Sequence, residues 1–342
     1  MIRYIFHPLM WLAVIAISTG IAGVAESESP DIAAAPLSGR LFFMTEGRIG
    51  SLGANDENPR FHSPEWKPGN PDLLPYWLRV SPDGGQIAFG IVGDQGPGVS
   101  LIEATGLYLR GRDATKPAVD TKRLAARWCW SPNGKQLAGS SIERPRGVPE
   151  AQHWIMEVPT LTVTSVNLPS DRLITDWSAD GNWFLTESAP FVEPRRNSIQ
   201  LVKRGGTEVR TLSDPKEHAI AARFSPSGRG VLLTTFDFRD RKSNLYVVQI
   251  GDDITRRKVS ADFFGQVVGA CWSPDNKQIA SVWRMKYIDP VKEAKAAYSL
   301  VVTDADGGNA VAIRTVTGQM PAEETAAHPL SWVTMSALDW QR

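Results

Sequence analysis

The residues of this chain that could do chemistry gather in five polar segments between apolar runs: 90–106, 141–153, 187–198, 236–243 and 282–297. Together these segments hold eleven basic and ten acidic side chains. Arginine and aromatic side chains are the types enriched at protein-binding hot spots. We therefore predict that the segments bind a protein or peptide, through Arg144, Arg195, Arg239, Trp283, Arg284 and Tyr287. The alternative interpretation is a solvated surface of mixed charge.

Catalysis is a further interpretation of the same segments. His153, Glu187, Asp237 and Arg284 would form a carbohydrate- or peptide-processing site if the fold brought them into one pocket. The sequence contains no G-x-S-x-G nucleophile motif and no H-x-x-x-H pair. The run from Asp304 to Gly308 does not fit an EF-hand loop and is typical of a turn. We expect no cofactor and no metal, and whether the chain is an enzyme stays open.

A repeated turn motif organises the chain around these segments. Ser81-Pro82-Asp83-Gly84 recurs at residues 131–134, 178–181, 225–228 and 273–276, at intervals of 50, 47, 47 and 48 residues. Proline, Asp or Asn, and Gly are suited to successive positions of a tight turn. A bulky residue precedes each turn and an apolar residue follows it, which predicts a hairpin. Two further strands per unit give four antiparallel strands in about 45–50 residues, the size of one propeller blade.

The two ends of the chain are predicted to complete the fold. Residues 41–62 supply three strands without a first one, and residues 329–333 resemble a first strand with no blade after it. We therefore predict an all-β, six-bladed β-propeller over residues 39–342, closed by pairing of the N- and C-terminal strands. Closure would remove the exposed sheet edges that recruit other chains. The Pro-rich connection 62–77 is expected to cover the ends of neighbouring blades.

A second candidate site is formed by the residues two positions before each turn motif, directly before its bulky residue. Around the predicted ring this position holds Arg79, Cys129, Asp176, Arg223, Cys271 and Ser331. Because the first strand of a blade is the innermost, Arg79, Asp176 and Arg223 could bind a carboxylate, a peptide terminus or another small ligand in a central channel. The alternative is that these charges pair with one another. The two cysteines fall on opposite sides of the ring, beyond the Cα separation of about 7 Å that a disulfide allows, so we predict free buried thiols.

The N-terminus is typical of an exported protein. Residues 1–25 combine a basic start, an apolar run and small residues before Glu26, the pattern of a secretory signal peptide. A retained anchor is the alternative, although the run is shorter than the roughly 20 residues that span a bilayer. Residues 26–38 are predicted to be a linker. We expect a periplasmic or secreted monomer with no stable membrane insertion. The 37 basic and 37 acidic residues argue against a nucleic-acid partner.

The repeat resembles a known propeller family. The unit W-S-P-D-G-x-x-I-A-F, followed by an apolar strand, a Gly-rich turn and a short strand, is similar to the propeller repeats of TolB, a periplasmic protein of the Tol-Pal system. Similar repeats occur in prolyl-oligopeptidase-type enzymes. The resemblance covers residues 39–342 and implies a TolB-like propeller with a protein partner in the cell envelope. TolB proteins also carry an α/β domain before the propeller, and the 26–38 linker is too short to be one.

Overall fold

The computed structural model describes residues 39–45, 48–53, 60–61, 74–92, 105–111, 119–192, 197–240, 242–251, 253–259, 266–288, 294–308, 311–319 and 339–341. The predicted signal peptide, the linker and most of the 62–77 connection lie outside these ranges. Within them, no helix is long and apolar enough to cross a membrane. One 3-10 turn, η1 (Pro145–Gly147), interrupts structure that is otherwise built from strands and turns.

Five four-stranded antiparallel sheets are each built from consecutive strands, and we number these sheets blades 1 to 5. Blade 1 contains β4 (Leu74–Val80), β5 (Gln86–Val92), β6 (Thr105–Gly111) and β7 (Val119–Leu124). Blade 2 contains β8 (Arg127–Trp130), β9 (Gln136–Glu143), β10 (Glu150–Glu157) and β11 (Val163–Val166). Blade 3 contains β12 (Arg172–Trp177), β13 (Trp183–Ser188), β14 (Ile199–Lys203) and β15 (Val209–Thr211).

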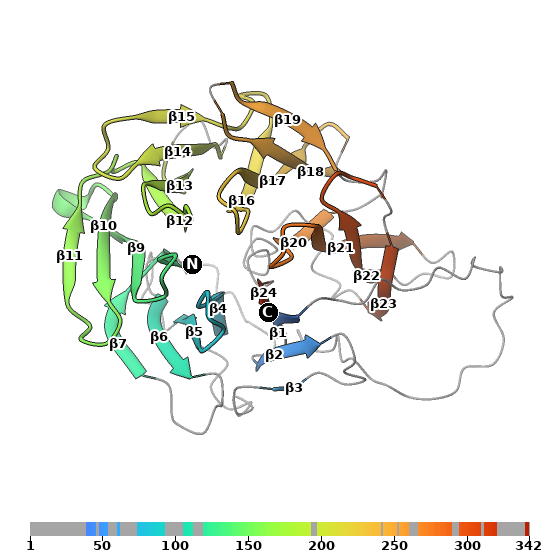
Figure 1. Ribbon diagram of the computed structural model, residues 1–342, viewed down its shortest axis with the longest axis horizontal. Helices are drawn as coiled ribbons and strands as arrows, with labels where there is room; N and C mark the ends of the chain where they lie inside the picture. Colours follow the sequence, from blue (N-terminus) through green and yellow to red (C-terminus); the bar gives the residue numbers. More distant parts are fainter. Residues whose placement is uncertain are drawn as a thin grey trace, which may run out of the picture.

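Blades 4 and 5 follow the same plan. Blade 4 contains β16 (His218–Phe224), β17 (Gly230–Asp237), β18 (Lys242–Gln249) and β19 (Thr255–Lys258). Blade 5 contains β20 (Gln266–Trp272), β21 (Gln278–Ile288), β22 (Ala294–Asp304) and β23 (Val311–Gln319). The sheets surround a common centre, with the first strand of each blade innermost (Figure 1). The predicted all-β propeller with four-stranded antiparallel blades is confirmed.

A further four-stranded sheet is formed from both ends of the chain, and we call it the composite sheet. It contains β1 (Arg40–Thr45), β2 (Arg48–Gly53), β3 (Arg60–Phe61) and, beside β1, β24 (Asp339–Gln341). It lies between blades 5 and 1 (Figure 1). The strand that pairs with β1 was predicted at 329–333, which lies outside the described residues, whereas the pairing strand is β24. The better sequence signal was Asp339-Trp340, which repeats the Asp176-Trp177 pair of blade 3.

The turn between the first two strands of each blade has the conformation that its sequence requires. In blade 1, the Ser81 hydroxyl donates to the Asp83 carboxylate at 2.5 Å and accepts the Gln86 N–H at 2.9 Å. The fourth turn residue has a positive φ in all five turns: Gly84, Gly134, Gly181, Gly228 and Asn276. Glycine and asparagine tolerate this left-handed conformation best. The predicted hairpins are therefore confirmed at the level of individual hydrogen bonds.

Apolar clusters fill the spaces between neighbouring sheets rather than one central core. Trp128 and Trp154 of blade 2 pack with Leu107 of blade 1, for example. The composite sheet packs on blade 5 through Leu41 and on blade 1 through Phe42. Each sheet thus buries both of its faces against its two neighbours.

Candidate functional site

Three of the predicted ring residues lie together near the propeller axis. Asp176 accepts the backbone N–H of Trp177 at 3.0 Å and that of Phe224 at 2.8 Å. Burial raises the pKa of Asp176, while Arg223 and Arg79 act in the opposite direction. The printed contacts of the Asp176 carboxylate are thus with backbone groups of blades 3 and 4.

Arg79 crosses from blade 1 toward blade 3. Its guanidinium donates to the carbonyl of Leu78 at 3.0 Å and reaches the carbonyl of Thr175 at 3.5 Å, and the side chain is buried. Burial raises the pKa of the Cys129 thiol of blade 2, the charge of Asp176 also raises it, and the charges of Arg79 and Arg223 lower it. Both cysteines are free and buried, as predicted.

By register, Asp339 holds in the composite sheet the position that Asp176 holds in blade 3, whereas Ser331 was predicted there. Asp339 pairs with Phe42 and Trp340 with Leu41, as Asp176 pairs with Leu185 and Trp177 with Phe184. Ser331 lies outside the described residues. In blades 1 to 5 this position holds Arg79, Cys129, Asp176, Arg223 and Cys271, and β24 carries Asp339 in the same register.

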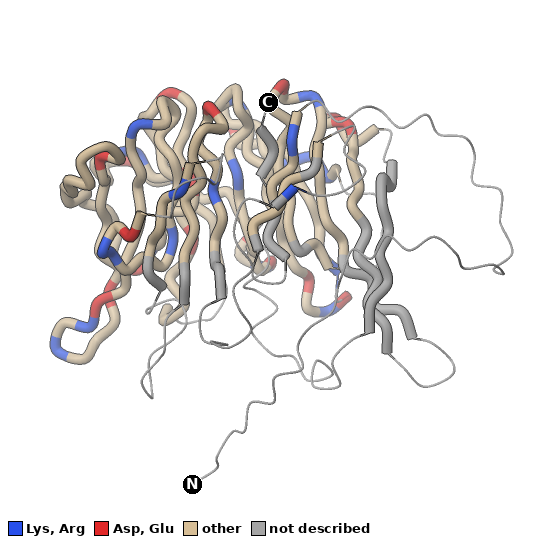
Figure 2. Tube along the Cα trace, turned by 90° about the horizontal axis from the view of Figure 1, so that it is seen from below, with Lys and Arg blue, Asp and Glu red and all other residues tan. Residues whose placement is uncertain are grey.

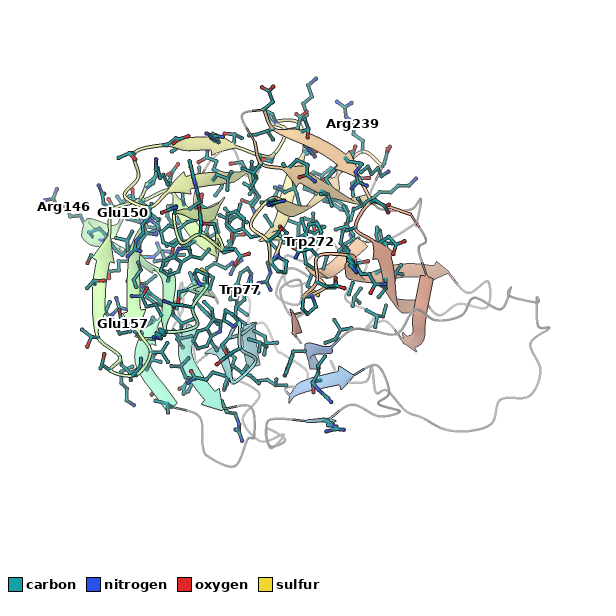
Figure 3. The ribbon with its side chains drawn as sticks, in the orientation of Figure 1. Trp77, Arg146, Glu150, Glu157, Arg239 and Trp272 are labelled. Carbon is teal, nitrogen blue, oxygen red and sulfur yellow. The ribbon has the colours of Figure 1, made fainter. Side chains whose placement is uncertain are left out.

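A stack of side chains that the sequence analysis missed joins blades 1, 2 and 3. The Trp77 ring lies between the guanidinium groups of Arg79, at 4.1 Å, and Arg127, at 4.2 Å. Arg127 Nε contacts Glu187 Oε1 at 2.6 Å, and both side chains are largely buried. Trp77 has a φ of +50° in the irregular part of β4 between Tyr76 and Arg79. Figure 3 shows Trp77 toward the centre of the molecule.

The residues proposed for catalysis are held in separate structural networks. His153 Nδ1 lies 2.9 Å from Ser140 Oγ, and Nε2 lies 2.9 Å from the Pro169 carbonyl. Because a carbonyl only accepts, Nε2 carries the proton and Nδ1 accepts from the hydroxyl of Ser140. Ser140 Oγ also accepts the N–H of Ile174, so this buried pair joins blade 2 to blade 3.

The other two residues whose side chains are described also have partners within the fold. Glu187 is bound to Arg127, and Asp237 accepts the N–H of Arg239 at 2.8 Å within its own turn. Arg284 lies on β21, and its side chain is not described. His153, Glu187 and Asp237 each therefore have hydrogen-bond or ion-pair partners of their own.

Arg172 is a second buried arginine that no sequence pattern indicated. Its guanidinium donates to Thr186 Oγ1, Ser188 Oγ and Ser198 Oγ and to the carbonyls of Thr186 and Ser198. Burial lowers its pKa to about 10. These contacts tie together three strands of blade 3, which is a structural role.

The second strand (B) of each blade ends, and the third strand (C) begins, on the same side of the disc, which we call the B–C face. In blade 4 this connection presents Phe238, whose side chain is 62% exposed, followed by exposed Arg239. The Phe238 ring meets His218 at 5.3 Å and Phe236 at 5.1 Å between centroids, both edge-on. Asp237 caps the turn, so an exposed aromatic residue is held on a defined support.

The remaining predicted binding residues have different outcomes. Arg144 is exposed on the B–C face of blade 2, beside exposed Val148, and Arg239 is exposed on that of blade 4. Figure 3 places the neighbouring Arg146 and Arg239 at the periphery of the molecule. Arg195 lies outside the described residues. Charged residues are spread over both faces of the disc rather than gathered on one (Figure 2).

The prediction of Trp283 as an exposed anchor was wrong. Trp283 is only 1% exposed and packs between blades 4 and 5, with its indole N–H donating to Ser281 Oγ at 2.9 Å. The predicted loop 282–297 is largely strand, because β21 continues to Ile288 and β22 begins at Ala294. Residues 282–288 are rich in β-branched and aromatic side chains, which favour strands. Tyr287, like Arg284, lies on β21, and its side chain is not described.

Comparison with known proteins supports the fold. Neither a family model nor a curated protein sequence matches the chain. The solved structure of TolB from Acinetobacter baumannii aligns with a TM-score of 0.58 and 13% identity, covering 83% of this chain and 65% of that one. A protein assigned as a TolB from Agrobacterium tumefaciens aligns with a TM-score of 0.55 and 17% identity, covering 82% and 89%. This chain thus spans just under two thirds of the A. baumannii protein.

A prolyl endopeptidase also aligns, with a TM-score of 0.48 and 12% identity, covering 85% of this chain and 50% of that one. That score is too low to carry an argument. Identities this low relate the folds and leave the activities separate. On the geometry of its blades and the two alignments with TolB structures, the chain has a β-propeller fold similar to that of TolB.

Proposed function

We propose that this chain is an exported, non-catalytic propeller of six blades, closed by its two ends, that binds a protein or peptide partner in the cell envelope. Support for export comes from residues 1–25, whose composition is that of a secretory signal peptide. The TolB-like fold agrees with an envelope location. We place the binding surface on the B–C face rather than at the axis, because the B–C face exposes the aromatic ring of Phe238.

One observation carries this proposal. Phe238 is 62% exposed on a capped turn, and it is followed by exposed Arg239. An exposed aromatic ring beside an arginine is the composition of a binding hot spot, and a rigid scaffold lowers the entropy lost on binding. Val148 provides a second exposed apolar side chain on the same face, close in sequence to exposed Arg144 and Arg146.

Partner capture from envelope extracts tests the proposal. The wild-type protein, Phe238→Ala and Val209→Ala would be compared by crosslinking, followed by affinity measurement with the purified partner. Val209 is the matched control, because it is an exposed apolar residue on the outer strand of blade 3. We expect Phe238→Ala to weaken binding about tenfold or more, and Val209→Ala to leave it unchanged. Equal binding by all three proteins, or no captured partner, would contradict the proposal.

A further inference from the structure

Blade 5 carries a three-stranded extension beyond its first strand. The pairing of β20 with β21 ends at Gln266 and Arg284. The pairing of β21 with β22 continues to Ile288 and Ala294, and that of β22 with β23 continues to Lys295 and Gln319. Within the described part of the chain, Met285–Ile288 are therefore paired on one side only.

Other blades end differently. In blades 1 and 3, the last residue of the second strand is paired with the first strand, at Val92 and at Ser188. In blade 4 one residue, Asp237, extends past that pairing. Three residues extend in blade 2, but there β11 pairs with β10 only as far as His153, so the extension has two strands. A three-stranded extension is a more stable platform than a two-stranded ribbon.

An unpaired strand edge presents a row of backbone N–H and C=O groups that can pair with another strand. Proteins use this for recognition, because an extended peptide gains backbone hydrogen bonds by joining the sheet. The second strand of each blade runs from the turn motif toward the B–C face. The Met285–Ile288 edge therefore lies at the B–C face, on the axial side of β21.

The charges of the extension favour one kind of partner. The sequence from 284 to 295 contains four basic residues and two acidic ones: Arg284, Lys286, Lys292 and Lys295 against Asp289 and Glu293. A second copy of the chain, pairing edge to edge, would therefore bring two segments of net positive charge together. Like charges in cross-strand positions are destabilising. An acidic strand from another protein avoids this repulsion.

We propose that the Met285–Ile288 edge of β21 accepts an extended, acidic polypeptide segment of a partner protein by strand addition. The inference rests on the proposed function for the choice of face. It is independent of Phe238, which belongs to blade 4.

Hydrogen exchange with a defined probe tests this inference. The probe is a ten-residue peptide alternating Glu and Val, and its control alternates Lys and Val. Successive residues of a strand direct their N–H groups to opposite edges, so alternate amides within 285–288 face the open edge. We expect the acidic peptide to slow exchange of those amides by about tenfold or more, and the basic peptide to have no effect.

Proline variants separate the edge from the hairpin. Of Lys286→Pro and Tyr287→Pro, one removes an N–H that faces β22 and the other removes an N–H that faces the open edge. We expect the variant that lacks an N–H at the open edge to keep the melting temperature of the protein. In that variant, the acidic peptide should no longer slow amide exchange within 285–288. Equal protection by both peptides, or protection that survives both proline variants, would overturn the inference.

Other occupants have their own signatures. Open-edge amides that are already protected in the free protein would assign the edge to another segment of this chain. Protection that depends on protein concentration, with a dimer in sedimentation, would assign it to a second copy. Either result overturns the proposal. Peptide protection retained in Phe238→Ala, together with unchanged partner capture by that variant, would instead support the strand addition and refute Phe238 as the anchor.

Discussion

The Arg127–Glu187 ion pair offers a quantitative test of how the blades are held together. Its atoms are 2.6 Å apart, and the side chains are only 13% and 5% exposed. At an effective dielectric constant of about 20, unit charges about 4 Å apart interact by about 4 kcal/mol. Breaking a buried pair by removing one partner typically costs about 3–5 kcal/mol, because the other charge stays buried. Glu187→Gln should therefore lower the free energy of unfolding by about 3 kcal/mol, since the amide oxygen still accepts one hydrogen bond.

A matched variant distinguishes burial from mere pairing. Asp120 and Lys122 form an ion pair at 2.7 Å, but the lysine is 83% exposed, so Asp120→Asn should leave the stability unchanged. Thermal unfolding followed by tryptophan fluorescence reports both, and Glu187→Gln should lower Tm by about 6–10 °C. The double variant Arg127→Met, Glu187→Gln should recover part of the loss, because no charge is left unpaired. If Glu187→Gln and Asp120→Asn had the same Tm, the conclusion that the Arg127–Glu187 ion pair stabilises the contact between blades 2 and 3 would be refuted.

Two further predictions concern the turns and the blade 2–3 junction. Gly134 has a φ of +67°, and a Cβ there would meet only Pro82 at 3.6 Å, so Gly134→Ala should lower the free energy of unfolding by about 1 kcal/mol through backbone strain. Gly134→Asn should lower it less, because Asn276 adopts the same conformation in blade 5. Equal decreases for both variants in urea unfolding would contradict this prediction. Burial lowers the pKa of His153 from its ordinary value of 6.5, so the unfolded chain binds a proton that the folded chain does not. The free energy of unfolding should therefore fall as pH drops below about 6.5. In His153→Gln the dependence of this free energy on pH between about 5 and 7 should flatten, and an unchanged dependence would contradict the role given to His153.

The features that the sequence predicted well are local ones. Each turn motif contains its own donors and acceptors within six residues, so Ser81, Asp83 and Gly84 can be recognised without knowing what packs around them. The interval between turns then sets the size of a blade. The same logic located the ring positions of Arg79, Asp176 and Arg223, because they keep a fixed place relative to each turn.

The features that it missed depend on distant partners. Arg127 and Glu187 are 60 residues apart, and Trp77 and Trp128, which share a hydrogen bond, are 51 apart. The length of β21 was also misjudged: the strand-favouring composition of 282–288 was read as a loop, and so Trp283 was taken as exposed. Phe238 had a usable signal, an aromatic residue inside the charged run 237–242, but its exposure depends on the neighbouring turn.

The ring near the axis is understood best as two copies of one arrangement. Its residues repeat after three blades: Arg79 and Arg223, Cys129 and Cys271, Asp176 and, by register, Asp339. In the first copy, the Arg79 guanidinium reaches the carbonyl of Thr175, the residue before Asp176, at 3.5 Å. The Asp176 carboxylate in turn accepts the backbone N–H groups of Trp177 and Phe224. These contacts link blade 1 to blade 3 and blade 3 to blade 4 through backbone groups, so both side chains stabilise the ring of sheets. The exposed side chains of Phe238 and Arg239 lie instead on the B–C face, which is where we propose that a partner binds.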